Sequence, residues 1–217
     1  MALKRTVGKV VSVCVSKPKL VRDFDGELVS SAIFKESVFG RIKLSKLNLD
    51  GDEQADLTVH GGIDKALYLY PFEHYPWWQG QMPDVEFING KFGENLTTTG
   101  IIESEVFIGD KFQVGTAVVK VSQPRLPCYK LGIKFGRTDV IKKFMMSGFS
   151  GIYFSVVKEG LLGVGDEIRY LEGDDCGITV SDVANLFNGS LSRDKEFIDR
   201  CLNSQLAEQM KRFISRL

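Results

Sequence analysis

The sequence predicts a mainly β protein: a barrel-like sheet with a few helices, followed by a small three-helix unit. Short β-branched and aromatic runs fill the first two thirds of the chain, and such runs are typical of strands. Glycines separate these runs, which favours a sheet that turns often. After a polar, glycine-flanked linker at 173–177, apolar residues recur at spacings of three and four, which is typical of helices.

Strands are predicted along the first two thirds of the chain. Residues 11–16 alternate apolar and polar side chains with period two, as a half-buried strand does. Further β-branched or aromatic runs predict strands at 67–70, 105–108, 112–121 and 152–157. We expect these strands to share one sheet.

A short internal recurrence favours a closed or curled sheet. Residues 108–112 and 164–168 share the pattern apolar-Gly-Asp-charged-apolar, and each leads into a strand. Glycine takes the positive φ that other residues resist, so each segment is expected to contain a tight turn. We therefore expect two strands of a barrel-like sheet to begin with the same kind of turn.

Two helical segments interrupt this region. Thr138 or Asp139 can cap a helix with an apolar stripe, and Gly148 is expected to end it. The aromatic segment 71–78 predicts one helical turn bounded by Pro76.

Three short helices are expected after the linker. The first begins near Thr179 or Ser181, the second has Ser192 as its N-cap, and the third begins at Ser204. The third carries apolar residues at spacings of 4, 3 and 4, which places them on one face.

The chain has 217 residues, enough for one large domain or for one domain with a small appendage. We expect the barrel-like domain at 1–173 and the three-helix extension at 174–217. A unit of about 40 residues buries little apolar surface alone, so it should dock on the barrel or on a second subunit. A homodimer and a cover over a cleft both stay open.

Charge and hydropathy exclude several classes of protein. The chain has 28 Lys and Arg against 28 Asp and Glu, whereas a general nucleic-acid binder needs a basic excess. No apolar run approaches the ~20 residues that span a bilayer, and the first ten residues lack the apolar core of a secretory signal. We expect a cytoplasmic protein with reduced thiols and without a nucleic-acid or membrane partner.

Cys128 is the strongest candidate for chemistry among the four cysteines, none of which forms a C-x-x-C pair. Its loop, 123–130, holds two prolines, which stiffen it, and two cations, Arg125 and Lys130. The cations favour the thiolate, the form that attacks or binds metal. The alternative is a small buried hydrophobe beside surface cations.

Two polar loops are weaker candidates. The segment HGGIDK at 60–65 has two glycines that let backbone N–H groups approach a ligand, and Lys65 offers an anion a point charge. A plain glycine turn explains it as well, because it matches no Walker or dinucleotide spacing. The loop 93–100 offers amide, hydroxyl and carboxylate groups suited to the edge of a heterocycle, or a plain turn.

Together these segments resemble the MOSC domain, the module named after the C-terminal part of molybdenum-cofactor sulfurases, and most of all its stand-alone bacterial YiiM-like branch. The matching stretches, in family order, are AIFKESVFGRIKL, LNLDGDEQADLTVHGGIDKALYLYP, FGENLTTTG, VFIGDKFQVG and VSQPRLPCYKLG. The tail from Gly177 resembles the three-helix extension of that branch.

The resemblance implies a predominantly β barrel with a cleft for the molybdenum cofactor, a phosphorylated pyranopterin that carries molybdenum on a dithiolene. Cys128 matches the family's cysteine, so its thiolate would ligate molybdenum or carry transferable sulfur. A soft thiolate suits a sulfur-rich metal centre. Asn95 and Thr97 would contact the pterin or hold their loop. The implied cofactor-binding residues are His60, Gly61, Gly62, Asp64, Lys65, Asn95, Thr97, Arg125, Lys35 and Arg41.

The resemblance leaves three functions open. The leading one is a molybdenum-dependent reductase of N-hydroxylated compounds, such as hydroxylaminopurine-type bases or amidoximes. Its electrons would come from an external flavin or iron–sulfur reductase, because the chain has no cysteine set for an iron–sulfur cluster and no dinucleotide fingerprint. The second is a sulfur carrier or transferase with a Cys128 persulfide for cofactor or metal–sulfur cluster assembly. The third is a non-enzymatic cofactor-binding protein.

Overall fold

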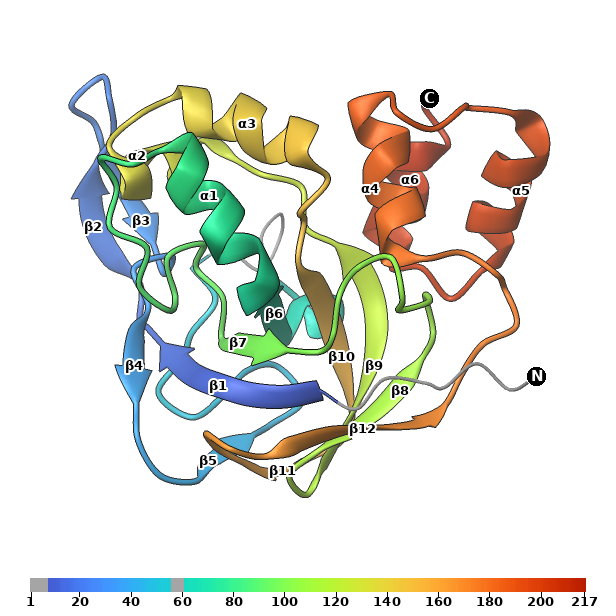
Figure 1. Cartoon of the computed structure of the whole chain (residues 1–217), viewed down its shortest axis with the longest axis horizontal. Coiled ribbons are helices and arrows are strands. Elements are labelled where there is room, and N and C mark those ends of the chain that lie inside the picture. Colours follow the sequence, from blue (N-terminus) through green and yellow to red (C-terminus); the bar gives the residue numbers. More distant parts are fainter. Residues whose placement is uncertain (1–7, 56–60) are drawn as a thin grey trace.

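Strands close into a barrel in the computed structural model, which describes residues 8–55 and 61–217. In those residues the barrel strands are β1 (Gly8–Val15), β6 (Leu67–Pro71), β7 (Leu96–Thr99), β8 (Lys111–Val114), β9 (Ala117–Pro124), β10 (Ile152–Lys158) and β12 (Glu167–Glu172). Their order is β12-β8-β9-β10-β6-β7-β1, and β1 pairs with β12 to close the ring (Figure 1). The mainly β, barrel-like prediction is confirmed.

Shorter strands decorate the barrel. β2 (Lys19–Arg22) and β3 (Leu28–Ser31) form a hairpin, β4 (Glu36–Val38) pairs with β1, and β5 (Ile42–Leu44) pairs with β11 (Gly160–Leu162). β6 and β7 run parallel, because a helical crossover joins them in the chain and a tight hairpin cannot.

Two strand predictions need correction. Residues 105–108 form no strand but an isolated antiparallel bridge, Phe107 to Thr179, in which Ile108 N donates to Ile178 O (2.9 Å) and Val106 O accepts from Val180 N (3.0 Å). The run 112–121 is two strands, β8 and β9, joined by a tight turn at Gly115, whose φ is 59°.

The recurrence at 108–112 and 164–168 behaves as expected. Gly109 and Gly165 have φ of 91° and 88°, and each turn leads into a barrel strand. Those strands, β8 and β12, are antiparallel neighbours in the sheet.

Helices cover one end of the barrel (Figure 1). They are η2 (Phe72–His74), α1 (Tyr75–Gln81), α2 (Tyr129–Phe135) and α3 (Asp139–Ser147), whereas η1 (Ile63–Lys65) lies against β9 and β10. α3 follows Thr138 and ends at Gly148, as predicted. Pro76 does not bound a turn: it lies in the first turn of α1, where a missing N–H costs nothing. Tyr70, Trp78 and Phe144 pack in a second core under these helices.

Three helices form the C-terminal extension: α4 (Val180–Asn188), α5 (Lys195–Asn203) and α6 (Glu208–Ile214). Thr179 caps α4, since its Oγ1 accepts from Asp182 N (3.0 Å) and Asp182 accepts from Thr179 N in return. Ser192 and Ser204 are not the N-caps of the other two helices. Asp194 caps α5, and Ser204 closes α5 instead by donating from its hydroxyl to Cys201 O (2.8 Å).

The extension docks on the barrel. Val183, Leu186 and Met210 belong to the same buried cluster as Val119 and Val121 of β9. The backbone joins the two parts as well, because Ala207 N donates to Ser122 O (3.1 Å). The domain division at residue 173 stays a prediction; β12 ends at Glu172 and α4 begins at Val180.

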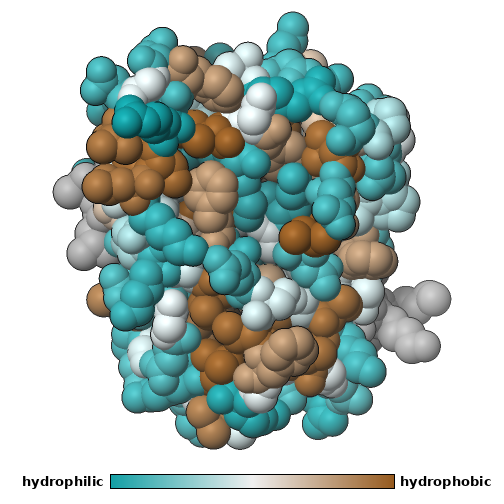
Figure 2. All heavy atoms as spheres, turned by 90° about the vertical axis from the view of Figure 1, so that its left-hand side faces the viewer, coloured by the Kyte–Doolittle hydropathy of each residue, from teal (hydrophilic) through white to brown (hydrophobic). Residues whose placement is uncertain are grey.

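The surface around the β2–β3 hairpin is mixed in polarity. Figure 2 shows this side of the molecule, with apolar patches between polar side chains. The hairpin itself exposes Leu20, Phe24 and Leu28. Across the described residues, no helix is long and apolar enough to cross a membrane.

Candidate functional site

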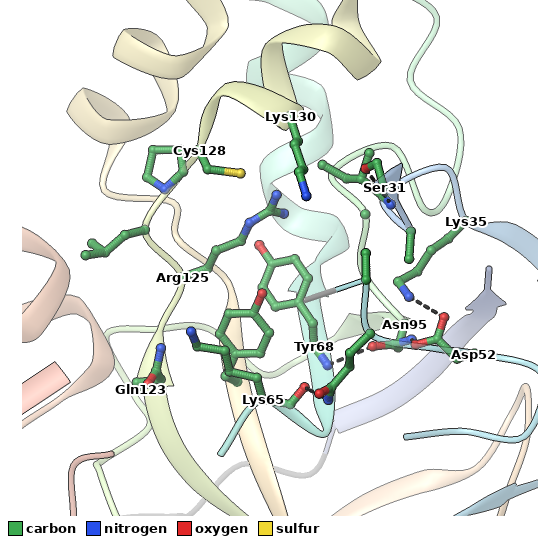
Figure 3. A pocket seen from close by; sticks show the side chains of 18 of the residues that line it. Ser31, Lys35, Asp52, Lys65, Tyr68, Asn95, Gln123, Arg125, Cys128 and Lys130 are labelled. Atoms are coloured by element: carbon green, nitrogen blue, oxygen red, sulfur yellow. Dashed lines mark hydrogen bonds and ion pairs between the residues drawn. The ribbon is translucent and has the colours of Figure 1, made fainter. Parts of the chain in front are cut away.

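A cavity of about 350 Å³ opens between the barrel, the β3–β4 connection and the C-terminal extension. Small-molecule sites in proteins usually measure about 300–1,000 Å³, so this one has the size of a ligand site. Its described lining comes from residues within 31–35, 52–55, 93–95 and 123–130, from Lys65, Tyr68 and Tyr153, and from α6. Figure 3 shows the cavity from close by.

Cys128 lies on the wall formed by the end of β9. Two prolines, Pro124 and Pro127, restrict this segment, and Cys128 is in extended backbone immediately before α2. Its thiol, the Arg125 guanidinium and the Lys130 ammonium point toward one another at the cavity (Figure 3). The side chain of Cys128 is half-buried, so the thiol is both sheltered and reachable.

Arg125 is held rigidly behind the thiol. It is 7% exposed, donates from Nη1 to Phe92 O, and places its guanidinium carbon 5.0 Å from the ring centroid of Tyr68. Tyr68 donates its own hydroxyl to Ser150 O (2.8 Å). Burial raises the pKa of Tyr68 and of Tyr153, so both phenols stay neutral beside the cation.

A buried polar network fixes the opposite side of the cavity (Figure 3). Lys35 and Asp52 form an ion pair whose side chains are 8% and 5% exposed. Asp52 also accepts from Ser16 N (2.8 Å) and from Asn95 Nδ2 (2.8 Å), and Asn95 Oδ1 accepts from Tyr68 N (3.1 Å). Burial lowers the pKa of Lys35, and the charge of Asp52 opposes that shift.

Lys134 supports this wall from behind. Its Nζ donates to Ile33 O (2.7 Å) and to Gly90 O, and so ties the segment after β3 to the loop before Asn95. Burial lowers the pKa of Lys134 to about 8. The nearby charges of Arg125 and Lys35 push in the same direction.

The turn at 61–65 is held by a residue that the sequence analysis did not single out. Gln54 Oε1 accepts from Gly62 N (2.7 Å), and Gln54 Nε2 donates to Lys65 O (3.2 Å). Lys65 lines the cavity and donates to Gln209 Oε1 on α6 (2.5 Å). Gly61, Gly62 and Asp64 are not among the lining residues, and His60 lies outside the described residues.

Thr97 and Arg41 also lie away from the cavity lining. Thr97 is fully buried and donates to Glu94 Oε1 (3.0 Å), so its contacts within the described residues hold the loop. Arg41 forms an ion pair with Asp166 (2.7 Å) and donates to Leu161 O (2.8 Å). The structure thus brings together five of the predicted residues: Cys128, Arg125, Lys35, Lys65 and Asn95.

Several lining residues carry little signal in the sequence. Gln123 is buried at the end of β9, beyond the run 112–121 that predicts a strand, so the sequence did not indicate its position. Tyr68 and Tyr153 look like ordinary alternating strand residues. Gln209 and Phe213 reach the cavity because α6 docks on the barrel, which no local pattern encodes.

A comparison with family models decides the relationship. Residues 56–169 match the model of the MOSC domain, more than half of the chain. The chain belongs to the MOSC family. The matched range holds Cys128, Arg125, Lys65 and Asn95, whereas Lys35 and α6 lie outside it.

Relatives of known sequence or structure extend the MOSC likeness over nearly the whole chain. The chain is 39% identical over 201 residues to the uncharacterized protein YflK of Bacillus subtilis, covering 93% of this chain and 90% of that one. It resembles the crystal structure of YiiM from Geobacillus stearothermophilus with a TM-score of 0.80 and 30% identity, over 96% and 98% of the two chains.

A third relative of this MOSC protein has a name that states an activity. A protein of Gibberella moniliformis named "Reductase" is 36% identical over 150 residues. The match covers 68% of this chain and 27% of that longer protein.

Proposed function

We propose that this MOSC protein binds the molybdenum cofactor in the cavity and reduces N-hydroxylated compounds there, with Cys128 as the thiolate ligand of molybdenum. The observation that carries the proposal is the convergence of the Cys128 thiol, the Arg125 guanidinium and the Lys130 ammonium on one cavity wall (Figure 3). The relative named as a reductase supports the class of reaction.

The residues of the cavity fit this cofactor. A thiolate is a soft ligand that suits a sulfur-rich metal centre. The described lining holds four cations, Lys35, Lys65, Arg125 and Lys130, against two carboxylates, Asp52 and Glu53. Both carboxylates already face cations, Lys35 and the exposed Lys17. The positive charges of Arg125 and Lys130 favour an anionic ligand such as a phosphorylated pterin.

The overall reaction requires an external electron donor. An N-hydroxyl compound R–NH–OH takes up two electrons and two protons and yields R–NH₂ and water. The bound cofactor supplies the two-electron oxygen-transfer chemistry. We propose a flavin or iron–sulfur reductase as the partner that delivers the electrons.

The protein's own groups hold and orient the reactants. Arg125 is locked by Phe92 O and by the Tyr68 ring, so it presents a fixed charge without reorganising. Tyr68 and Tyr153 stay neutral because burial raises the pKa of each. Asn95 is fixed by Asp52, and this keeps the opposite wall in place.

Cofactor content tests the proposal. The protein is purified without oxygen from a molybdate-fed host and analysed for molybdenum and for the fluorescence of oxidised pterin. We expect near-stoichiometric molybdenum in the wild type and a large loss in Cys128→Ser, since a hydroxyl is a poor ligand for a soft metal. Cys176→Ser is the matched control, because Cys176 is another partly exposed thiol and lies outside the cavity lining.

Turnover completes the test. With a chemical reductant, the wild type and Cys176→Ser should reduce an amidoxime to the amidine, and Cys128→Ser should not. Full activity in Cys128→Ser would exclude the thiolate ligand. Absence of molybdenum from cofactor-replete cells, with a mass gain of one sulfur atom on Cys128, would favour sulfur transfer instead.

A further inference from the structure

Gln123 carries a buried polar atom that nothing in the described structure satisfies. The residue is 4% exposed and lines the cavity, and its Oε1 has no hydrogen-bond partner among the described residues. Its Nε2 makes one long contact, 3.5 Å, to Pro124 O. A buried acceptor without a partner is costly, so a ligand that donates a hydrogen bond would gain the most here.

Helix α6 stands at the same end of the cavity. Gln209, Met210 and Phe213 of α6 are lining residues. Met210 is 2% exposed, whereas Phe213 is 38% exposed and therefore still offers part of its ring. An aromatic face at the edge of a ligand cavity suits a flat ligand group.

Contacts on either side of Gln123 fix α6 in this place. Ser122 O accepts from Ala207 N (3.1 Å), directly before α6, and Ser122 Oγ donates to Asp64 O (2.5 Å). Lys65 donates to Gln209 Oε1 (2.5 Å). Gln123 thus lies where β9, the 61–65 turn and α6 are tied together.

We propose that Gln123 and α6 form the substrate-recognition end of the cavity, which takes a flat N-hydroxylated group bearing an N–H donor. Gln123 Oε1 accepts that N–H, and Phe213 packs on the plane of the group. This inference rests on the proposed function, since it names the part of the substrate that the site reads. The thiol end, with Cys128 and Arg125, is left to the cofactor.

The proposal assigns a role to the C-terminal extension. Its last helix supplies the apolar wall that selects for flat, aromatic substrates. Gln123 selects for the donor, and a site built to pair with a donor rejects analogues that lack it far more strongly than it rejects a missing methylene.

Equilibrium binding and turnover of two probes test the assignment. Benzamidoxime has an N–H donor on its amidine nitrogen, and N,N-dimethylbenzamidoxime has none there. We expect the wild type to bind benzamidoxime at least tenfold more tightly, and Gln123→Met to lose that preference. Gln113→Met is the matched control, because Gln113 lies on β8 outside the lining and donates to Gly115 O (3.0 Å).

Stability and cofactor content separate recognition from folding. Gln123→Met removes an unsatisfied polar group without changing side-chain length, so its melting temperature should equal or exceed that of the wild type. Its molybdenum content should also match the wild type. Phe213→Ala should weaken benzamidoxime binding at least threefold and leave the aliphatic acetamidoxime unaffected.

The outcomes of the two proposals are distinguishable. Binding of benzamidoxime with the expected variant effects, but without reduction, would leave the recognition end standing and refute the proposed reductase. Equal binding by the wild type and Gln123→Met, or no binding by either, would overturn the recognition end whatever the cofactor analysis shows.

Discussion

Asp52→Asn removes the negative charge that faces the buried ammonium of Lys35. In the wild type, Asp52 accepts from Lys35, from Ser16 N and from Asn95 Nδ2. Asparagine keeps one acceptor oxygen, but its amide N–H₂ then faces a donor. Since both side chains of the ion pair are less than 10% exposed, Lys35 is left as a buried charge without its counter-charge.

The expected loss follows from that geometry. Breaking a buried pair by removing one partner costs about 3–5 kcal/mol, and a protein of this size loses about 2–4 °C of melting temperature per kcal/mol. We expect Asp52→Asn to lower the free energy of unfolding by about 3–5 kcal/mol, measured by urea denaturation at pH 7. Glu53→Gln is the control, because its ion pair with Lys17 is exposed and is worth less than about 1 kcal/mol.

The pH dependence gives this prediction a second signature. Burial lowers the pKa of Lys35 in the folded protein, and Asp52 opposes the shift. Without Asp52 the folded-state pKa falls further below that of the unfolded chain. Deprotonation then relieves the penalty in the variant, so the loss should shrink as pH rises toward the folded-state pKa of Lys35 in the wild type, which lies below 10.5, and should be constant above it. A loss at pH 7 no larger than that of Glu53→Gln would refute the reasoning.

Two other expectations concern the cap of α4 and the ammonium behind the cavity. Thr179→Ala should lower the free energy of unfolding by about 1 kcal/mol in urea denaturation, because it breaks the capping box. Thr138→Ala is the control and should lower it clearly less, since Thr138 makes no side-chain cap bond. Equal losses in the two variants would contradict the role of Thr179 as the cap. The pKa of Lys134 is lowered by burial to about 8, so the unfolding free energy of the wild type minus that of Lys134→Met should increase as pH rises from about 8 to 10.5. A flat difference over that window would contradict the shift.

Local sequence patterns were enough to predict much of the fold. The alternation in 11–16 and the Gly-Asp turns report on burial and on backbone φ, and both properties act within a few residues. The helix α2 carries no such signal, because its apolar residues, at 129, 131, 133 and 135, alternate with period two, which is typical of a strand. Ser204 was assigned to the wrong helix because a serine hydroxyl serves a C-terminal turn as readily as an N-cap.

The candidate site likewise has a part that local sequence predicts and a part that depends on tertiary packing. Cys128, Arg125 and Lys130 lie within six residues of one loop, so the sequence alone predicts that they are close to one another. Arg41 looked equally available as an anion contact, but its ion pair with Asp166 joins residues 125 apart in the chain. The wall formed by α6 depends likewise on tertiary docking, and an isolated segment cannot show that.

The closure of the barrel has a kinetic consequence. The strand pair that completes the ring joins Gly8 to Ile168 and Lys9 to Glu167, near opposite ends of the domain. Such a long-range pairing loses the conformational entropy of closing a large loop before its own contacts form and offset that loss. We expect folding to be slow for this reason. The cavity is drawn from segments as distant as 31–35 and α6, so site assembly and folding share this dependence on long-range contacts.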